Sequence, residues 1–396
     1  MKELISSIIV KTPKNQAIKT SEYLEKGKYP VIDQGENYIS GYSNNDEMLY
    51  NGDMPVILFG DHTRCLKLVK EPFIIGADGI KVLEPNNKYD KIYFYYAVLN
   101  VIQNQLKNYG YERHFKYLKQ EKIESYEIDK QKKIAKVLSN YDDLIENNTK
   151  RIDILEDMAK KLYKEWFVDF KFPGHENIEF KTSELGNIPS DWNVLHIGDI
   201  ISTIESGSRP KGGINPRDNE IPSIGAENIL GLGKYDYSKE KYISLKFFEK
   251  MKKGKIQNND VLLYKDGAKL GRKSIFGDSF PYEKCVINEH VFILRCNTKC
   301  SQYYLYFTLD TKENTDNIIK LNANAAQPGI NQEQVKGLKI LVAPMEIIRA
   351  FDLKIASIVS QIFNLCKKNR NLQQTRDMLL PRLMSGEIDV EDLEIK

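Results

Sequence analysis

The most regular pattern of apolar and polar positions in the chain lies between Lys130 and Phe170. Apolar side chains recur there at alternating steps of four and three residues, and one Asn interrupts them. This spacing is a heptad repeat, which predicts a helix roughly 60 Å long with a single apolar stripe. Most of the other positions are charged or polar, as expected for a solvated outer face. The stripe consists of Ile134, Leu138, Tyr141, Ile145, Asn148, Ile152, Leu155, Ala159, Leu162 and Trp166.

The same pattern returns near the end of the chain, over residues 345–385. A shift of 217 positions places Leu138 on Ile355 and Leu162 on Leu379. Two unrelated amphipathic helices are the simpler explanation, but chance rarely keeps such a phase over so many turns. The pattern therefore favours an internal duplication in which a globule and a helix alternate twice. The second stripe consists of Phe351, Ile355, Ile358, Ile362, Leu365, Asn369, Leu372, Arg376, Leu379 and Leu383.

Each stripe needs an apolar partner, and the two helices supply one for each other. In an antiparallel pair, one alignment sets Asn148 opposite Asn369. A slip of one heptad would set Asn369 against Leu155, or Asn148 against Ile362. A buried Asn pair commonly fixes the register of a coiled coil. The sequence thus predicts that Asn148 faces Asn369.

The segments between the helices alternate short apolar runs with Gly, Pro, Asn and Asp, which is typical of mixed α/β domains. Ala343-Pro344 opens the second long helix, and Pro381 is expected to end or kink it. Strands are expected over Pro30–Asp33, Val56–Phe59, Phe73–Ile75 and Ile80–Leu83, and a helix over Lys91–Asn108. The expected divisions are 1–128 (first domain), 129–170 (first long helix), 171–190 (linker), 191–344 (second domain), 345–385 (second long helix) and 386–396 (tail).

Composition adds little to this picture but limits the protein class. The chain has 396 residues, of which 41% are hydrophobic and 29% charged, and its net charge is +3. Near-neutral charge argues against a uniformly basic protein but leaves room for basic patches. The five cysteines match no zinc-binding pattern, so reduced thiols in a cytoplasmic protein are expected. We find no signal peptide and no apolar run of the roughly 18 residues that a membrane span needs.

Three stretches of the sequence carry a resemblance to a known family. They are IAKVLSNYDDLIENNTKRI at 134–152 with LYKEWF at 162–167, LGNIPSDW at 185–192 with Gly198-Asp199, and TRDMLLPRLMSGEI at 375–388. In this order they resemble the central conserved region, the lead-in to the second target-recognition domain, and the distal conserved region of type I restriction–modification specificity subunits. The first globule lacks an Ile-Pro-x-x-Trp lead-in.

The resemblance implies both a fold and a role. The expected fold is two α/β target-recognition domains separated by two long helices that form an antiparallel coiled coil, with a pseudo-twofold internal repeat. The expected role is a non-catalytic DNA reader, in which each domain reads half of a bipartite duplex site. The helices would set the spacing and dock two modification (methyltransferase) subunits, which restriction (endonuclease/translocase) subunits can join. S-adenosylmethionine, ATP and Mg would sit on those partners, and none on this chain.

The absence of known catalytic motifs from the sequence supports the same interpretation. The sequence has no Gly-x-x-x-x-Gly-Lys-Ser/Thr phosphate loop, no Gly-x-Gly-x-x-Gly motif after a strand, and no Asn-Pro-Pro-Tyr-like loop of amino-methyltransferases. The five histidines show no spacing of a metal site. We therefore expect no catalytic residue and no metal.

Polar and basic loops near the ends of the predicted strands are the candidate DNA contacts. Arg reads guanine with two donors, Asn and Gln pair with adenine, and Lys contacts phosphates. A solvated surface loop is the alternative for each cluster. The candidates in the first domain are Gln34, His62, Thr63, Arg64, Tyr111, Arg113, His114 and Lys116. Those in the second domain are Arg209, Lys211, Lys265, Lys269, Arg272, Lys273, Asn324 and Gln327.

Two other functions fit the same features. A stand-alone bivalent DNA-binding scaffold or regulator would have this fold without an enzyme partner. A coiled-coil adaptor would join two protein partners through its globules. DNA binding that weakens steeply with salt would exclude the adaptor, and co-purification with a methyltransferase would exclude the scaffold.

Overall fold

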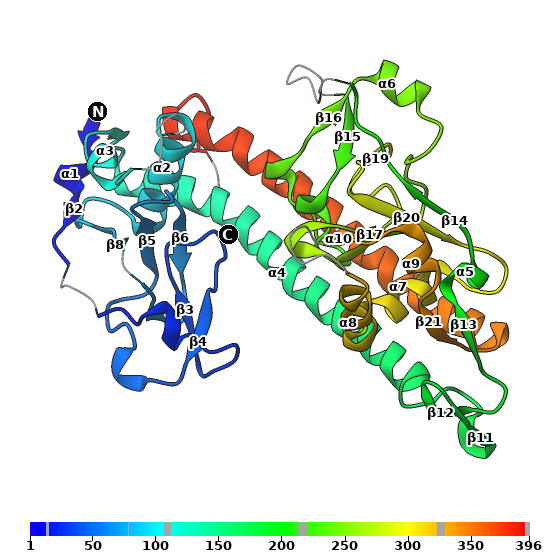
Figure 1. Cartoon of the computed structure of the whole chain (residues 1–396). Helices are drawn as coiled ribbons and strands as arrows, with labels where there is room; N and C mark the ends of the chain where they lie inside the picture. The colour runs from blue at the N-terminus through cyan, green and yellow to red at the C-terminus, as the bar shows by residue number, and fades with distance from the viewer. Residues whose placement is uncertain are drawn as a thin grey trace. The chain divides into compact units, whose positions relative to one another are not determined.

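The structure is a computed structural model of the whole chain, and it describes residues 1–12, 16–77, 79–106, 112–211, 213, 220–322 and 329–392. The chain forms two compact units, one of residues 1–145 with 372–396 and the other of residues 146–371. Each unit contains an α/β domain and a part of both long helices, α4 (Ile128–Phe167) and α10 (Met345–Ser385). Figure 1 labels most of the elements and colours the chain from blue at its start to red at its end.

The first unit builds its domain from short strands and three helices. β5 is the central strand of a three-stranded sheet, pairing with β6 and β8, while β3 pairs with β4 and, in parallel, with β7. The helices are α1 (Ile5–Ile8), α2 (Lys91–Asn104) and α3 (Phe115–Leu118). The strands are β1 (Lys2–Leu4), β2 (Ile9–Val10), β3 (Tyr29–Ile32), β4 (Gly41–Ser43), β5 (Val56–Gly60), β6 (Leu66–Val69), β7 (Ile74–Ile75), β8 (Ile80–Val82), β9 (Glu84–Pro85) and β10 (Lys122–Glu124).

The second unit repeats this plan with additional elements. β17 lies between β18 and β20, and β15 pairs with β16 and, in parallel, with β19. The helices are α5 (Ile197–Ile200), α6 (Leu245–Lys250), α7 (Gln302–Asp310), α8 (Lys312–Lys320) and α9 (Gln332–Lys336). The strands are β11 (Phe180–Ser183), β12 (Gly186–Pro189), β13 (Asn193–His196), β14 (Ile201–Ser206), β15 (Ile221–Ile224), β16 (Tyr242–Ile243), β17 (Asp260–Tyr264), β18 (Lys273–Phe276), β19 (Val286–Ile287), β20 (Val291–Cys296) and β21 (Lys339–Val342).

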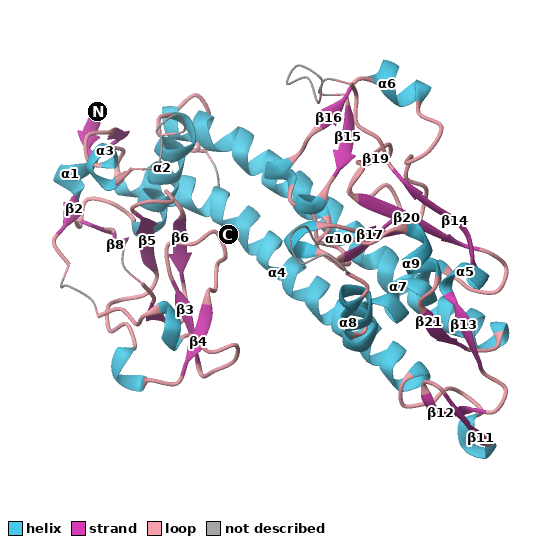
Figure 2. Cartoon of the chain, in the orientation of Figure 1, coloured by secondary structure: helices cyan, strands magenta, loops and turns pink. Residues whose placement is uncertain are grey.

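The correspondence between the domains extends from their first strand to their last. β1 pairs antiparallel with β10 in the first unit, as β13 does with β21 in the second, and each first strand is followed by a four-residue helix. Even the caps agree: Asp90 accepts a hydrogen bond from Tyr93 N–H at the start of α2, and Ser301 accepts one from Tyr304 N–H at the start of α7. The predicted duplication is therefore present in the fold, as the strands and helices in Figure 2 illustrate.

The apolar stripes of α4 and α10 enter the cores of both units. All the stripe positions are buried or half-buried, Asn148 and Asn369 included. In the second unit, Trp166 and Phe351 pack with ring centroids 6.1 Å apart, and the Asn148 side-chain amide donates to the Asn369 carbonyl oxygen over 2.9 Å. Residue numbers rise along one helix as they fall along the other, so the pair is antiparallel. The predicted register is confirmed.

The first unit has a polar pair of its own between the two helices. Arg376, a stripe residue, forms an ion pair with Asp142, and Tyr96 of α2 donates to the same carboxylate over 2.5 Å. Further along, Lys130 lies 3.2 Å from Asp389 of the tail. The helices are therefore antiparallel in this unit too.

Three sequence-based expectations differ from the structure. Residues 171–190 are more than a connecting segment, because β11 and β12 pair there as an antiparallel hairpin. Of the two effects expected of Pro381, ending the helix at that residue is excluded, because α10 continues to Ser385. The predicted helix over Lys91–Asn108 ends at Asn104, and residues 107–110 lie outside the described part. No helix among the described residues is long and apolar enough to cross a membrane.

Candidate nucleic-acid interface

In the first unit, the candidate residues gather where β5 ends. The chain turns back tightly there, because Gly60 N–H donates to the Cys65 carbonyl and Arg64 N–H donates to the Gly60 carbonyl, each over 2.8 Å. Arg64 has a φ of 63°, a left-handed conformation that closes the turn. The side chains of this loop therefore project from the end of a buried strand.

A second loop, which carries Gln34, lies against the first. Gln34 accepts from His62 N–H through its side-chain oxygen (3.2 Å) and from the Thr63 hydroxyl through its backbone carbonyl (2.5 Å). Gly79 also approaches closely, and a Cβ added to it would lie 2.7 Å from the Gln34 amide. The φ of Gly79 is 98°, so glycine suits this position on both counts. Gln34 is distant in sequence from His62 and Thr63, yet the three candidates lie in one small region.

Asp61 joins these loops to the segment before α3. Its N–H donates to the Gly79 carbonyl (2.7 Å), and its own carbonyl accepts from His114 N–H (2.7 Å). Its carboxylate accepts from Phe115 N–H over 2.9 Å, and the residue is only 5% exposed. Sequence reasoning did not choose Asp61, because an acidic residue makes a poor phosphate contact. The sequence feature that could have indicated a role for Asp61 is its position directly after a buried strand.

The candidates on this face differ in exposure. Arg113 and Lys116 are exposed, whereas Arg64 is half-buried and donates to the Leu106 carbonyl over 2.5 Å. Lys116 pairs with Glu112 (3.1 Å). Tyr111 lies outside the described residues.

His114 is a correction to the sequence-based set. Its side chain is 1% exposed, so it cannot touch DNA in this conformation. Burial, and then the nearby Arg64 charge, hold the pKa of His114 below its usual range. It is therefore a neutral core residue at neutral pH, and only the exposed residues near it, such as Arg113 and Lys116, can contact DNA.

In both units, the residue that follows the central strand connects it through two backbone hydrogen bonds to neighbouring segments, and we call this residue with its two bonds the joint. The joint residue is Asp61 after β5 and Lys265 after β17. Lys265 N–H donates to the His290 carbonyl (3.1 Å), and the Lys265 carbonyl accepts from Ile330 N–H (2.9 Å). These are the two backbone bonds that Asp61 makes in the first unit. By hydrogen-bond register, Asp61 therefore corresponds to Lys265, one position before Asp266.

A network of charged side chains surrounds the second joint. His290 Nδ1 lies 2.9 Å from an Asp266 carboxylate oxygen, and its Nε2 lies 3.3 Å from Glu289. Glu289 also forms an ion pair with Arg209 at 2.6 Å. The network brings the loop of Arg209 to the loop of Asp266. His290 was considered in the sequence only for the spacing of a metal site, so this use of it was missed.

The remaining candidates of the second unit divide by burial. Lys211, Lys269 and Arg272 are exposed, and Lys265 is half-buried with its ammonium 5.1 Å from the centre of the Phe292 ring. Lys273 is 4% exposed and is the second correction, because a buried ammonium cannot reach a phosphate. Asn324 and Gln327 lie outside the described residues.

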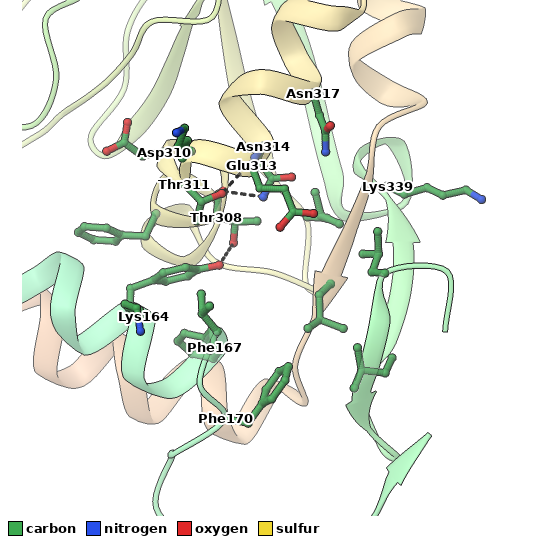
Figure 3. A pocket seen from close by; sticks show the side chains of 18 of the residues that line it. Lys164, Phe167, Phe170, Thr308, Asp310, Thr311, Glu313, Asn314, Asn317 and Lys339 are labelled. Carbon is green, nitrogen blue, oxygen red and sulfur yellow. Dashed lines mark hydrogen bonds between the residues drawn. The ribbon is translucent and has the colours of Figure 1, made fainter. Parts of the chain in front are cut away.

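A pocket of about 710 Å³ lies elsewhere in the second unit (Figure 3). It lies among the end of α4, the α7–α8 junction, the β11–β12 hairpin and β21. Phe167 and Thr308 line it, and Lys164, Glu313 and Lys339 add charges of both signs. Among the described residues, no group of three or more His, Cys, Asp or Glu side chains could hold a metal ion. The pocket contains none of the candidate DNA contacts.

Comparison with known proteins agrees with this architecture. A family model described as "Type I restriction modification DNA specificity domain" matches residues 7–157 and again residues 189–375. Two relatives from Methanocaldococcus jannaschii are the type I restriction enzyme MjaIX and MjaVIII specificity subunits. The first is 27% identical over 339 residues, covering 82% of this chain and 75% of the relative. The second is 24% identical over 393 residues, covering 96% and 90%.

A crystal structure of a type I restriction–modification system S subunit from M. genitalium has the same fold. It superimposes with a TM-score of 0.58 at 17% identity, and the match covers 97% of this chain and 96% of that one. The repeat of two α/β domains and two long helices is thus shared with a solved S subunit. Since the family model matches both halves of the sequence, this chain belongs to the type I restriction modification DNA specificity domain family.

Proposed function

We propose that this chain is the DNA-specificity subunit of a type I restriction–modification complex, and that each of its α/β domains reads one half of a bipartite duplex site. The observation that carries the proposal is the duplicated joint at the ends of β5 and β17. The backbone bonds of the joint are the same in both units, whereas the exposed side chains around it differ. A common scaffold with different loops is suited to reading two different base sequences.

The exposed cations around each joint have the chemistry for this task. Arg113 and Lys116 in the first unit, and Lys211, Lys269 and Arg272 in the second, can contact phosphates or guanine edges. The overall charge of +3 is small, so binding would depend on these local groups.

The long helices are proposed to set the spacing of the half-sites, and side-chain contacts fix each domain onto them. In the second unit, Arg370 of α10 lies between the Tyr237 and Tyr282 rings, 4.3 and 4.2 Å from their centroids. In the first unit, Tyr96 bonds to Asp142 of α4. A domain held this way turns with its helix, as a spacer requires.

The same helices are proposed to dock two modification subunits. Large apolar side chains are exposed on them, although the stripe residues are not. A soluble helix gains by covering such groups with a partner. They are Ile128, Leu144, Ile154 and Met158 on α4 and Leu353 and Met378 on α10. In the proposed complex, methyl transfer and cleavage belong to the modification and restriction subunits, together with S-adenosylmethionine, ATP and Mg.

Co-expression with a type I modification subunit tests the proposal. We expect a stable complex that methylates DNA at one bipartite sequence, with the site mapped by sequencing of methylated bases. The chain alone should shift duplex DNA in a gel, and the shift should weaken steeply with salt. A complex that methylates without sequence preference, or a chain that binds no DNA at low salt, would contradict the proposal. DNA binding by a chain that forms no complex with a modification subunit would instead identify a stand-alone scaffold.

A further inference from the structure

We infer that Asp61 and Asp266 are positioning residues for specificity: neither reads DNA itself, and each holds the reading loops of its own unit in place. The inference rests on the proposed DNA-reading function and adds a prediction about which residues keep the loops in register. Both acids lie among candidate DNA contacts, where a negative charge opposes phosphate binding. Their place there needs a reason other than direct contact.

Asp61 is buried and fully engaged with neighbouring loops. Its backbone connects the strand end to Gly79 and to His114, and its carboxylate accepts from Phe115 N–H at 2.9 Å. Arg113 and Lys116 flank that connection and are exposed. A carboxylate that accepts a backbone N–H at the start of a helical turn fixes the direction of the segment. The positions of the two cations therefore depend on Asp61.

Asp266 performs the corresponding task through a side chain. Its carboxylate lies 2.9 Å from His290 Nδ1, and the other His290 nitrogen lies 3.4 Å from Arg209. The backbone of Asp266 forms a bridge with Gly329. Asp266 thus connects the Arg209 loop to the chain at Gly329. The two acids occupy neighbouring rather than identical positions of the repeat.

A test must separate positioning from simple charge. Removal of an acid near DNA strengthens electrostatic attraction for every sequence alike, whether Ala or Asn replaces it. Positioning predicts a difference between these two replacements. The Asn side-chain oxygen of Asp61→Asn can still accept from Phe115 N–H, whereas Asp61→Ala cannot. The same holds for Asp266→Asn and Asp266→Ala toward His290.

The experiment selects binding sites from pools of duplex DNA with the full-length chain and its Asp61 and Asp266 variants. We expect Asp61→Ala to reduce discrimination at one half-site by about tenfold, within the usual effect of one base pair, and to leave the other half-site unchanged. Asp266→Ala should do the reverse. Both Asn variants should stay close to the parent chain. Thermal unfolding of each variant separates lost specificity from lost folding, and the Asn variants keep the test valid if an Ala variant unfolds.

Three results would overturn the inference. They are equal behaviour of the Ala and Asn variants, loss of selectivity at both half-sites from one substitution, and unchanged selectivity in both Ala variants. If the parent chain itself selects no sequence, the proposed function fails instead, and the two failures are thereby distinguished.

Discussion

Lys269 and Lys273 are four positions apart in the most basic segment of the chain, yet they occupy opposite environments. Lys269 is exposed. Lys273 is buried on β18, where its ammonium donates to the Thr315 hydroxyl over 2.5 Å and lies 3.9 Å from Asp310. Its partners come from α7 and α8, some forty positions later. No local pattern can reveal such burial, which is why sequence reasoning treated both lysines alike.

DNA binding should distinguish these two lysines. We expect Lys269→Ala to weaken binding at every sequence and to reduce the slope of log affinity against log salt by about one, as the loss of one phosphate contact does. Lys273→Met should leave both quantities unchanged, because its ammonium cannot reach DNA. Gel shifts at several salt concentrations measure both effects. A larger binding loss in Lys273→Met, in a variant that unfolds like the parent, would mean that β18 rearranges on DNA.

Lys273 should also make stability depend on alkaline pH. Burial lowers the pKa of Lys273 to about 8, although Asp310 partly opposes this shift. Between about pH 8 and 10.5 the unfolded chain holds this proton and the folded chain does not, so stability rises with pH across that window. Below pH 8 both states are protonated and the burial cost is present in full. Urea unfolding from pH 7.5 to 10 should show the rise in the parent chain and a smaller one in Lys273→Met. Equal slopes of unfolding free energy against pH in the parent chain and in Lys273→Met would contradict this prediction.

At the scale of the element, the long helices were the most predictable part of the protein. Their signal is local and repeats over many turns, so one misplaced residue does not change the interpretation. The heptad phase of the two stripes was enough to predict that Asn148 faces Asn369. It was not enough to predict the ion pair of Asp142 with Arg376, because Tyr96 of another helix helps to place that carboxylate. Loops were hardest to predict, since their partners lie on distant segments.

The Asn pair should stabilise the register more than the fold. Asn148→Leu removes the donor to Asn369 and sets an apolar group against its amide, which should cost about 1–3 kcal/mol of unfolding free energy. The double variant Asn148→Leu, Asn369→Leu replaces both partners and should recover most of that loss. Urea unfolding of the single and double variants forms a double-mutant cycle. If the double variant is as unstable as the sum of the two single variants, the pair does not act as a unit.

At the scale of the whole molecule, the repeat was predictable, whereas the grouping of the long helices with the domains was not. The sequence places the boundaries at the ends of the long helices, whereas each compact unit takes residues from both helices. Contacts such as Trp166 with Phe351 create this arrangement, and a helix pattern alone does not show which domain its two ends join. The hairpin of β11 and β12 was also missed, because each strand has only one large apolar residue, Phe180 or Ile188, and so lacks the apolar run that marks the other strands.

The end of α10 lies near the start of the chain, and this makes circular permutation feasible. Tyr126 donates to the Met384 carbonyl at 3.1 Å, and one small pocket is lined by both Lys2 and Ser385. The first residues and the end of α10 therefore lie near each other. A chain joined from residue 396 to residue 1 by a short linker, and opened after Gly174, should fold and bind DNA with unchanged selectivity. Circular dichroism and site selection measure this, and loss of folding would count against the equivalence of the two halves.

The last prediction concerns the distance between half-sites. Seven residues added after Ile145 and seven after Asn371 would lengthen both helices by one heptad and keep Asn148 opposite Asn369. The added length is about 10 Å, or roughly three base pairs of duplex. The reading loops are unchanged, so both half-sites should keep their base sequences. Mapping of methylated sites with the reconstituted complex should therefore find the same half-sites at a spacing longer by about three base pairs. If the spacing stayed fixed, the helices would not determine it, and the arrangement proposed for the two readers would be wrong.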